Sequence, residues 1–340
     1  MKLQVLVGAF LVAVSTSNAA DAVFSADGKT VYAVPWRDLT GVWRIDAATG
    51  EGEIIPFPKP MEGVSVFGIA REKSGALLLA TSKIIWSWEP GKKVATKRVS
   101  MEEESFWDVA VHPATQNLIM DCRDFDMPFL AAPGWGRAGR MFARRAEGAS
   151  KFAFAADGTA FFAVGGDLWA GNLYWWDKNE NEIPKQVEGE KEAYEYAHAF
   201  GTEAARMVAL GVLQSNSSNQ RNVTLDSIAT SRERVYVWVG NRDSGELISL
   251  PMGPMTAAAK EDASPSVSDA ETFLKLSGTL IREARFYSKT LGMSGKHPWL
   301  CASDDHRRIF VRGSDEDGEA LFLITDDGEP RKIAAFEGDD

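Results

Sequence analysis

Short runs of alternating apolar and polar residues, separated by turn signals, fill most of the chain. In the stretch 22–34, AVFSADGKTVYAV, an apolar run leads into Asp-Gly and then into a second alternating run. Asp-Gly supplies the positive-φ position that a tight hairpin requires. Two more runs of the same kind follow, GVWRID and GEIIPF. The pattern predicts a unit of four antiparallel strands within residues 22–56.

The same unit recurs along the chain at intervals of roughly 40 residues, the length of a four-stranded propeller blade. The clearest recurrence is FAFAADGTAFFAV at 152–164. Such repetition predicts an all-β fold, a β-propeller of four-stranded antiparallel blades, because a closed ring leaves no long sheet edge exposed. Seven blades are favoured, with residues 190–222 counted as a degenerate blade, and six is the alternative. The other recurring segments are 66–100, 106–122, 225–252 and 297–336.

The amino-terminal residues differ from the repeats. Residues 1–20, MKLQVLVGAFLVAVSTSNAA, join one Lys, an apolar run and small residues, which is typical of a signal peptide. The apolar run is too short to span a bilayer. We therefore expect export to the periplasm or the medium, with no membrane span after cleavage. Residues 21–340 should form a single propeller domain with an irregular Ala-, Ser- and Pro-rich insertion near 252–296.

Two of the repeats resemble those of a known superfamily. FSADGKTVYAV is similar to the FSPDGK-type hairpin of TolB-like bacterial propellers, and VYVWVGNRDSGELISL at 235–250 resembles the YVTN repeat. The resemblance implies a secreted bacterial β-propeller of the YVTN/TolB-like (WD40-like) superfamily. It implies no activity, because lactonases, receptors, scaffolds and ligand binders share this ring.

Composition narrows the range of partners. The net charge is −11, which disfavours nucleic-acid binding because phosphate backbones attract basic surfaces. Cys122 and Cys301 each lie in an apolar, strand-like run. Two buried thiols are the simpler interpretation, although an oxidising compartment also permits a disulfide. We expect a monomer or a subunit of a complex.

The candidate site consists of polar and aromatic residues that follow the second strand of several units. Arg and Asp recur together there, and aromatic residues accompany them. One hypothesis is ion pairing between blades with ordinary turn chemistry; the other is a binding ring on the loop face, since Arg and aromatic residues are enriched at binding hot spots. The candidate binding residues are Trp36, Arg37, Asp38, Arg123, Asp124, Asp126, Asp167, Trp169, Asn241, Arg242, Asp243, Asp315 and Asp317.

No motif predicts a metal, a cofactor or a catalytic residue. The loop 177–188 carries Glu182 where a calcium loop needs Gly, and the loop that begins at Gly313 lacks the first acidic ligand. The four histidines show no zinc spacing, and a G-x-S-x-G elbow is absent from the sequence. The favoured function is an exported non-enzymatic propeller that binds a protein partner or small ligand through its loop face. The alternative is a hydrolase or lactonase-like enzyme with its site at the mouth of the central channel.

Overall fold

The structure is a computed structural model that describes the strands of the ring and most of their tight turns. The described residues are 22–34, 40–100, 106–111, 113, 116, 118–122, 129–131, 139–140, 150–157, 159–164, 167–172, 206–209, 224–241, 244–254, 256, 282–287, 291 and 299–336.

Six four-stranded antiparallel sheets make up the described fold, and each consists of consecutive strands. We call these sheets blades 1 to 6. A single 3₁₀ turn, Lys59–Met61, joins blades 1 and 2. Blade 1 holds β1 (Ala22–Phe24), β2 (Thr30–Ala33), β3 (Gly41–Asp46) and β4 (Gly52–Pro56); blade 2 holds β5 (Val66–Arg71), β6 (Leu77–Thr81), β7 (Ile84–Trp88) and β8 (Ala95–Ser100); blade 3 holds β9 (Phe106–Val111), β10 (Leu118–Cys122), β11 (Phe129–Ala131) and β12 (Gly139–Arg140).

The second half of the chain repeats this order, with short outermost strands in blades 4 and 5. Blade 4 holds β13 (Ser150–Phe154), β14 (Thr159–Val164), β15 (Asp167–Asn172) and β16 (Arg206–Ala209); blade 5 holds β17 (Thr224–Thr230), β18 (Arg234–Asn241), β19 (Ser244–Pro251) and β20 (Arg285–Phe286); blade 6 holds β21 (Leu300–Ala302), β22 (Arg308–Asp315), β23 (Gly318–Thr325) and β24 (Arg331–Ala335).

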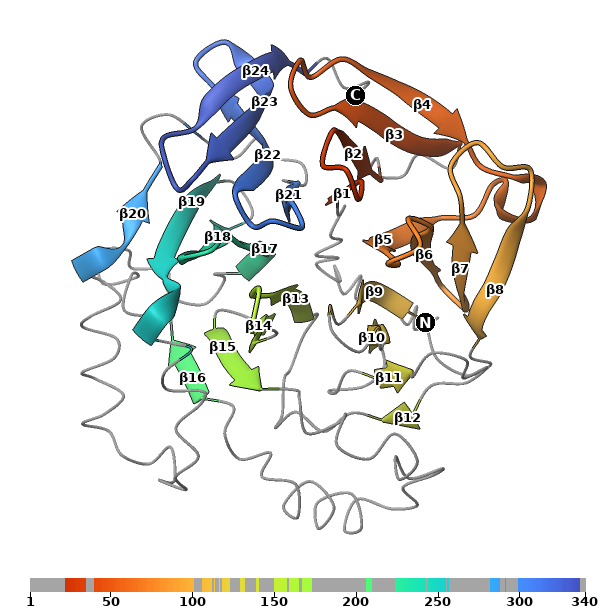
Figure 1. The fold of residues 1–340 in the computed structure, drawn as a ribbon, viewed down its shortest axis with the longest axis horizontal. Coiled ribbons are helices and arrows are strands. Elements are labelled where there is room, and N and C mark those ends of the chain that lie inside the picture. The colour runs from red at the N-terminus through yellow and green to blue at the C-terminus, as the bar shows by residue number, and fades with distance from the viewer. Residues whose placement is uncertain are drawn as a thin grey trace, which may run out of the picture.

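The blades stand around a central channel as a β-propeller (Figure 1). The innermost strands contact one another in the cyclic order β1, β5, β9, β13, β17 and β21, and β21 returns to β1. The described strands thus form six blades, the alternative count, and the predicted seventh blade is not confirmed. The error lies in residues 190–222. Instead of starting a blade of its own, β16 in that region pairs with β15 as the fourth strand of blade 4.

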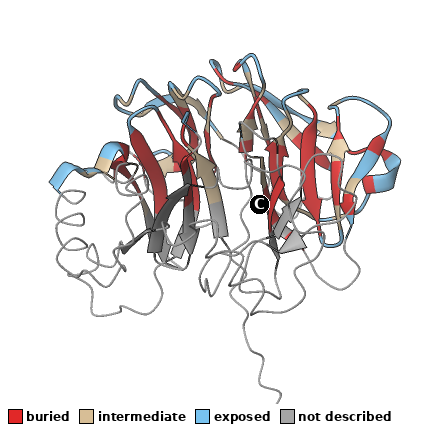
Figure 2. Cartoon of the chain, turned by 60° about the horizontal axis from the view of Figure 1, so that its bottom comes forward, coloured by how far each residue is buried: buried red, intermediate tan, exposed pale blue. Residues whose placement is uncertain are grey.

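The hydrophobic core lies between the blades, because alternate side chains of a strand point to opposite faces of its sheet. In β6, Leu77 and Leu79 pack toward blade 1, whereas Leu78 and Ala80 pack toward blade 3. Both faces of the inner strands are therefore buried, and the exposed residues gather at the turns and on the outermost strands (Figure 2). Tryptophans of third strands fill the space between blades: Trp86 and Trp88 pack between blades 1 and 2, and the partly buried Trp43 packs between blades 1 and 6.

The opening hairpin forms as predicted, between β1 and β2. The Asp27 carboxylate accepts hydrogen bonds from the Ser25 hydroxyl and the Lys29 amide. Gly28 has φ +65, and a Cβ there would meet the Arg308 guanidinium of blade 6. The positive φ therefore favours glycine in this turn, and the lack of a side chain leaves room for the Arg308 guanidinium.

Several predictions about the chain ends and loops concern residues outside the described ranges. The predicted signal peptide, residues 1–20, is one of them, as is most of the insertion near 252–296. Within the described part of the chain, no helix is long and apolar enough to cross a membrane.

Candidate binding site

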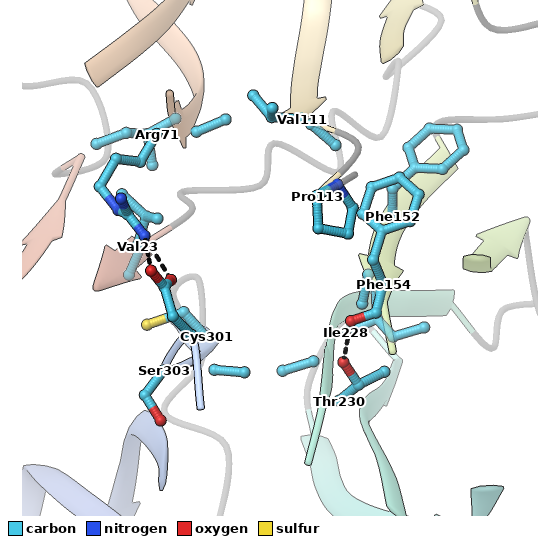
Figure 3. A pocket seen from close by; sticks show the side chains of 18 of the residues that line it. Val23, Arg71, Val111, Pro113, Phe152, Phe154, Ile228, Thr230, Cys301 and Ser303 are labelled. Carbon is cyan, nitrogen blue, oxygen red and sulfur yellow. Dashed lines mark hydrogen bonds and ion pairs between the residues drawn. The ribbon is translucent and has the colours of Figure 1, made fainter. Parts of the chain in front are cut away.

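A cavity of about 460 Å³ occupies the central channel and is lined by residues of all six innermost strands. Residues of the turns that follow β1, β5, β9 and β21 also line it, so it reaches the edge of the ring where the first hairpins lie. Its volume falls in the range of small-molecule sites, roughly 300–1,000 Å³. Figure 3 shows that its two sides differ in character.

One side of the cavity is charged and centres on Arg71, the last residue of β5. The Arg71 side chain is 9% exposed. Its Nε donates to the carbonyl of Phe24 in blade 1 at 2.7 Å, and its Nη1 donates to the carbonyl of Glu72 at 3.4 Å. Its Nη2 bonds both carboxylate oxygens of Asp304, in the first turn of blade 6. Arg71 thus connects three blades at the channel mouth.

The opposite side of the cavity is apolar. Phe152 and Phe154 of β13 lie across the cavity from Arg71, next to Pro113 (Figure 3). Ile228 of β17 continues this wall and is buried. Both phenylalanines are half-buried, so part of their surface remains available to a ligand.

Hydrogen bonds join blades 4, 5 and 6 at the same edge of the ring. The hydroxyl of Thr230 donates to the carbonyl of Phe154 at 2.6 Å. Nδ1 of His306, which lies 2.9 Å from the Thr230 carbonyl, donates to that oxygen. The imidazole thus carries a proton on Nδ1. These bonds fix the positions of the first turns relative to one another. His306 lies in the first turn of its blade.

A single described carboxylate lies deeper in the channel. Asp108 of β9 is buried, and its Oδ1 accepts a hydrogen bond of 2.7 Å from the Val109 amide. Gly68 of β5 faces it, and a Cβ at Gly68 would come within 2.5 Å of Asp108 Oδ1. The absence of a side chain at Gly68 is what allows Asp108 to occupy this position between blades 2 and 3.

Cys301 of β21 also lines the cavity, and its thiol is buried and unbridged. This agrees with the buried-thiol interpretation for Cys301. Cys122 belongs to β10, but its side chain lies outside the described part of the structure. Where the structure is described, no three His, Cys, Asp or Glu residues are grouped as a metal site would require.

The predicted binding residues are placed only in part. Asp315 and Asp317 flank the turn between β22 and β23, where Lys332 Nζ lies 2.8 Å from Asp315 Oδ2 and 3.2 Å from Asp317 Oδ2. Neither residue lines the cavity. Asp167, Trp169 and Asn241 belong to β15 and β18, not to loops, and their side chains are not described; Trp36, Arg37, Asp38, Arg123, Asp124, Asp126, Arg242 and Asp243 lie outside the described residues.

Sequence reasoning missed the polar residues at the other edge of the ring. Arg71 and Thr230 end the innermost strands of blades 2 and 5, and Asp304 lies two residues beyond the end of the innermost strand of blade 6. Aligning the first turns instead of the second-to-third-strand loops gives this set, since each turn carries a polar residue directly after a short apolar run.

Comparisons with known proteins support the fold alone. No protein-family model matches the chain, and no curated protein matches its sequence. Hydrazine synthase of Kuenenia stuttgartiensis is similar in structure, with a TM-score of 0.51, 12% identity, and coverage of 95% of this chain and 99% of that one. Streptogramin B lyase has a TM-score of 0.50 and 10% identity, with coverage of 95% of this chain and 84% of that one. A protein assigned as a gluconolactonase has a TM-score of 0.52 and 12% identity, with coverage of 92% of this chain and 89% of that one. At such identities the likeness establishes a β-propeller and no activity.

Proposed function

We propose that this protein is an exported, non-enzymatic β-propeller that binds a small ligand in the mouth of its central channel. The observation that carries the proposal is the cavity of about 460 Å³ with Arg71 on one side and Phe152 and Phe154 on the other. A mostly apolar pocket with a few fixed polar groups is the usual form of a small-molecule site. Export rests on the leader-like residues 1–20.

Hydrogen bonding at the cavity favours binding over catalysis. A nucleophilic hydroxyl needs a base that takes its proton. The Thr230 hydroxyl lies 3.4 Å from His306 Nδ1, but it donates to the Phe154 carbonyl, and Nδ1 itself donates to a carbonyl. These groups hold the turns in place and are not arranged as a nucleophile and its base.

The alternative function is a hydrolase or lactonase-like enzyme with its site at the same mouth. One observation favours it: with its proton on Nδ1, His306 has Nε2 as its basic atom, and His306 lines the cavity. A general base on a channel mouth can activate water. Two of the structurally similar proteins are called a lyase and a gluconolactonase. Hydrolysis of lactones or esters that is lost in His306→Gln would support this alternative.

The binding proposal is tested by blocking the cavity. Ala26 is an exposed turn residue that lines it, whereas Ala48 is an exposed turn residue that does not. The chain from residue 21 is screened by thermal shift against a defined set of carboxylic acids, sugars, aromatic amines and nucleosides. Hits should bind the wild type and Ala48→Trp and should be lost in Ala26→Trp. If no compound binds, or if Ala26→Trp binds as the wild type does, the proposal fails.

A further inference from the structure

We propose that the ligand of this cavity carries a carboxylate, which Arg71 binds in place of Asp304, and an aromatic or apolar body, which lies against Phe152 and Phe154. The inference rests on the proposed function and specifies the ligand class for the same site. It follows from how Arg71 is held, from how weakly Asp304 holds it, and from the wall that faces it.

The Arg71 guanidinium is preorganised toward an anion. Its side chain is 91% buried, since 9% remains exposed. The bond of 2.7 Å from Nε to the Phe24 carbonyl fixes the plane of the group from the blade 1 side. A buried positive charge is costly without an anionic partner. The cavity mouth therefore offers a fixed cation that requires a negative group at Nη2.

Asp304 supplies that negative group only loosely. Its side chain is 59% exposed, so water can solvate the Asp304 carboxylate when a ligand carboxylate takes its place on the buried Arg71. Both Asp304 oxygens bond the same nitrogen, Nη2, whereas the strongest arginine–carboxylate pairs use two parallel N–H donors. Nη1 has only a long contact of 3.4 Å to the Glu72 carbonyl. A ligand carboxylate that bonds Nη1 and Nη2 together can therefore displace Asp304 at small cost.

The rest of the lining selects the remainder of the ligand. Phe152 and Phe154 lie across the cavity from Arg71 (Figure 3), and aromatic faces bind apolar or aromatic groups. A phosphate dianion is disfavoured because Asp304 and the buried Asp108 share the lining with Arg71. Lys73 and His306 are the other titratable groups at the rim, and Lys73 is exposed. Asp108 is three residues from the end of β9, about 10 Å below the rim at strand geometry.

Matched pairs of acids and amides test the inference on the chain from residue 21. The probes are benzoate, phenylacetate, 3-phenylpropionate, 4-phenylbutyrate and 1-naphthoate, each beside its neutral amide, and the readout is isothermal titration calorimetry at pH 7. At least one acid should bind about tenfold or more tightly than its amide, since a charge-assisted bidentate pair distinguishes the two. Phe154→Leu should weaken the binding of that acid, because the substitution removes the aromatic face.

The decisive variant is Asp304→Asn. It leaves Arg71 in place and removes its internal competitor, so the dissociation constant of the acid should fall by about two- to fivefold. A purely structural role for the Arg71–Asp304 pair predicts no gain. Asp326→Asn is the matched control, since Asp326 is an exposed turn aspartate that pairs with Arg307 at 3.8 Å, away from the cavity. Arg71→Lys keeps the charge but loses the two-nitrogen geometry and should abolish most of the preference for the acid.

Two results would overturn the inference. One is that no acid binds, or that amides bind as tightly as acids; the other is that Asp304→Asn leaves binding unchanged or weakens it. If some other compound binds and Ala26→Trp removes it, the proposed binding function survives and only the ligand class is wrong. Near-ultraviolet circular dichroism of each variant reports whether the ring is intact.

Discussion

Blade 6 is joined to its two neighbours by different chemistry. Toward blade 1 the interface is aromatic, with Trp299 and Phe336 of the blade 6 side meeting Trp43 of β3. Toward blade 5 it contains a buried polar network around Tyr236. Both interfaces also have an apolar core. The same four-stranded unit can therefore close the ring through aromatic packing on one face and bury hydrogen-bonded polar groups on the other.

The interface with blade 1 closes the ring. Each blade consists of consecutive strands, so β1 and β24 belong to separate sheets and side-chain packing joins the two ends of the domain. The Phe336 ring lies 5.2 Å from that of Trp299 and 5.6 Å from that of Trp43. The Arg312 guanidinium lies over both Trp299 and Phe336, at 4.8 and 4.5 Å, and pairs with Glu319. Cation–π contacts of this kind strengthen with desolvation.

The interface with blade 5 satisfies buried polar groups. The Tyr236 hydroxyl donates to Asp327 Oδ1 of blade 6 at 2.8 Å, and its ring stacks on Tyr287 at 6.1 Å. Behind it, within blade 5, Arg234 is buried and bonds the hydroxyl and carbonyl of Ser249 and the carbonyl of Glu283. Burial lowers the pKa of Arg234, and the positive charge of Arg285 adds to this. The hydrogen bond from the Tyr236 hydroxyl fixes the geometry here, whereas aromatic and cation–π packing dominates at the ring-closing interface.

Truncation of the ring-closing aromatic should have the largest effect. Trp299 is fully buried, and its indole nitrogen has no hydrogen-bond partner among the described atoms. Trp299→Ala therefore removes packing without breaking a hydrogen bond of the indole, and the free energy of unfolding should fall by about 3–5 kcal/mol. Urea denaturation measures it. Val94→Ala, at a side chain that is 67% exposed, should stay within about 0.5 kcal/mol of the wild type. A loss below about 1 kcal/mol in Trp299→Ala would show that packing at this interface does not hold the ring closed.

Removal of one hydroxyl at the other interface should cost less. Tyr236→Phe keeps the ring and the stacking but leaves Asp327 without its donor, so we expect a loss of about 1 kcal/mol at pH 7. The same urea titration measures it. If the loss equals that of Trp299→Ala, the polar interface is as important for closure as the aromatic one, and the distinction between the two fails.

The pH dependence of stability should identify Tyr236 specifically. Burial, and then the nearby Tyr287 and Asp327, raise the pKa of Tyr236 above its ordinary value of 10.0. The folded protein thus keeps this proton above pH 10 while the unfolded chain loses it. Stability should be level with respect to Tyr236 below pH 10 and should fall above it, by about 1.4 kcal/mol per pH unit for one group. Tyr236→Phe should remove the contribution of this one group, about 1.4 kcal/mol per pH unit, from the fall in stability above pH 10. An unchanged slope would mean that Tyr236 ionises as easily in the folded protein.

Local sequence patterns predicted the strands, but they could not predict contacts between residues that are far apart in the sequence. The Asp-Gly turn at Gly28 and the alternation in β6 follow from neighbours in sequence. The blade count failed at 190–222 because a short alternating run does not reveal which sheet it joins, and β16 completes blade 4. The pairing of Arg71 with Asp304 spans 233 positions. This ion pair forms only when the whole ring closes, so no local sequence motif predicts it.

The smallest effect is expected at the outer edge of blade 6, where Lys332 pairs with Asp315 and Asp317. These bonds lie within one blade and join β24 to the β22–β23 turn. Lys332 and Asp317 are exposed and Asp315 is half-buried, so Lys332→Gln should leave the urea midpoint at pH 7 unchanged within error. Hydrogen bonding to Lys332 lowers the pKa of Asp315 from its ordinary value of 3.8. Whatever stability the pair adds is thus present above pH 3.8 and is lost as the pH falls below it. In Lys332→Gln the loss of folding stability below pH 3.8 should be slightly smaller than in the wild type. A marked destabilisation at pH 7 would instead show that this pair supports blade 6 as its two buried interfaces do.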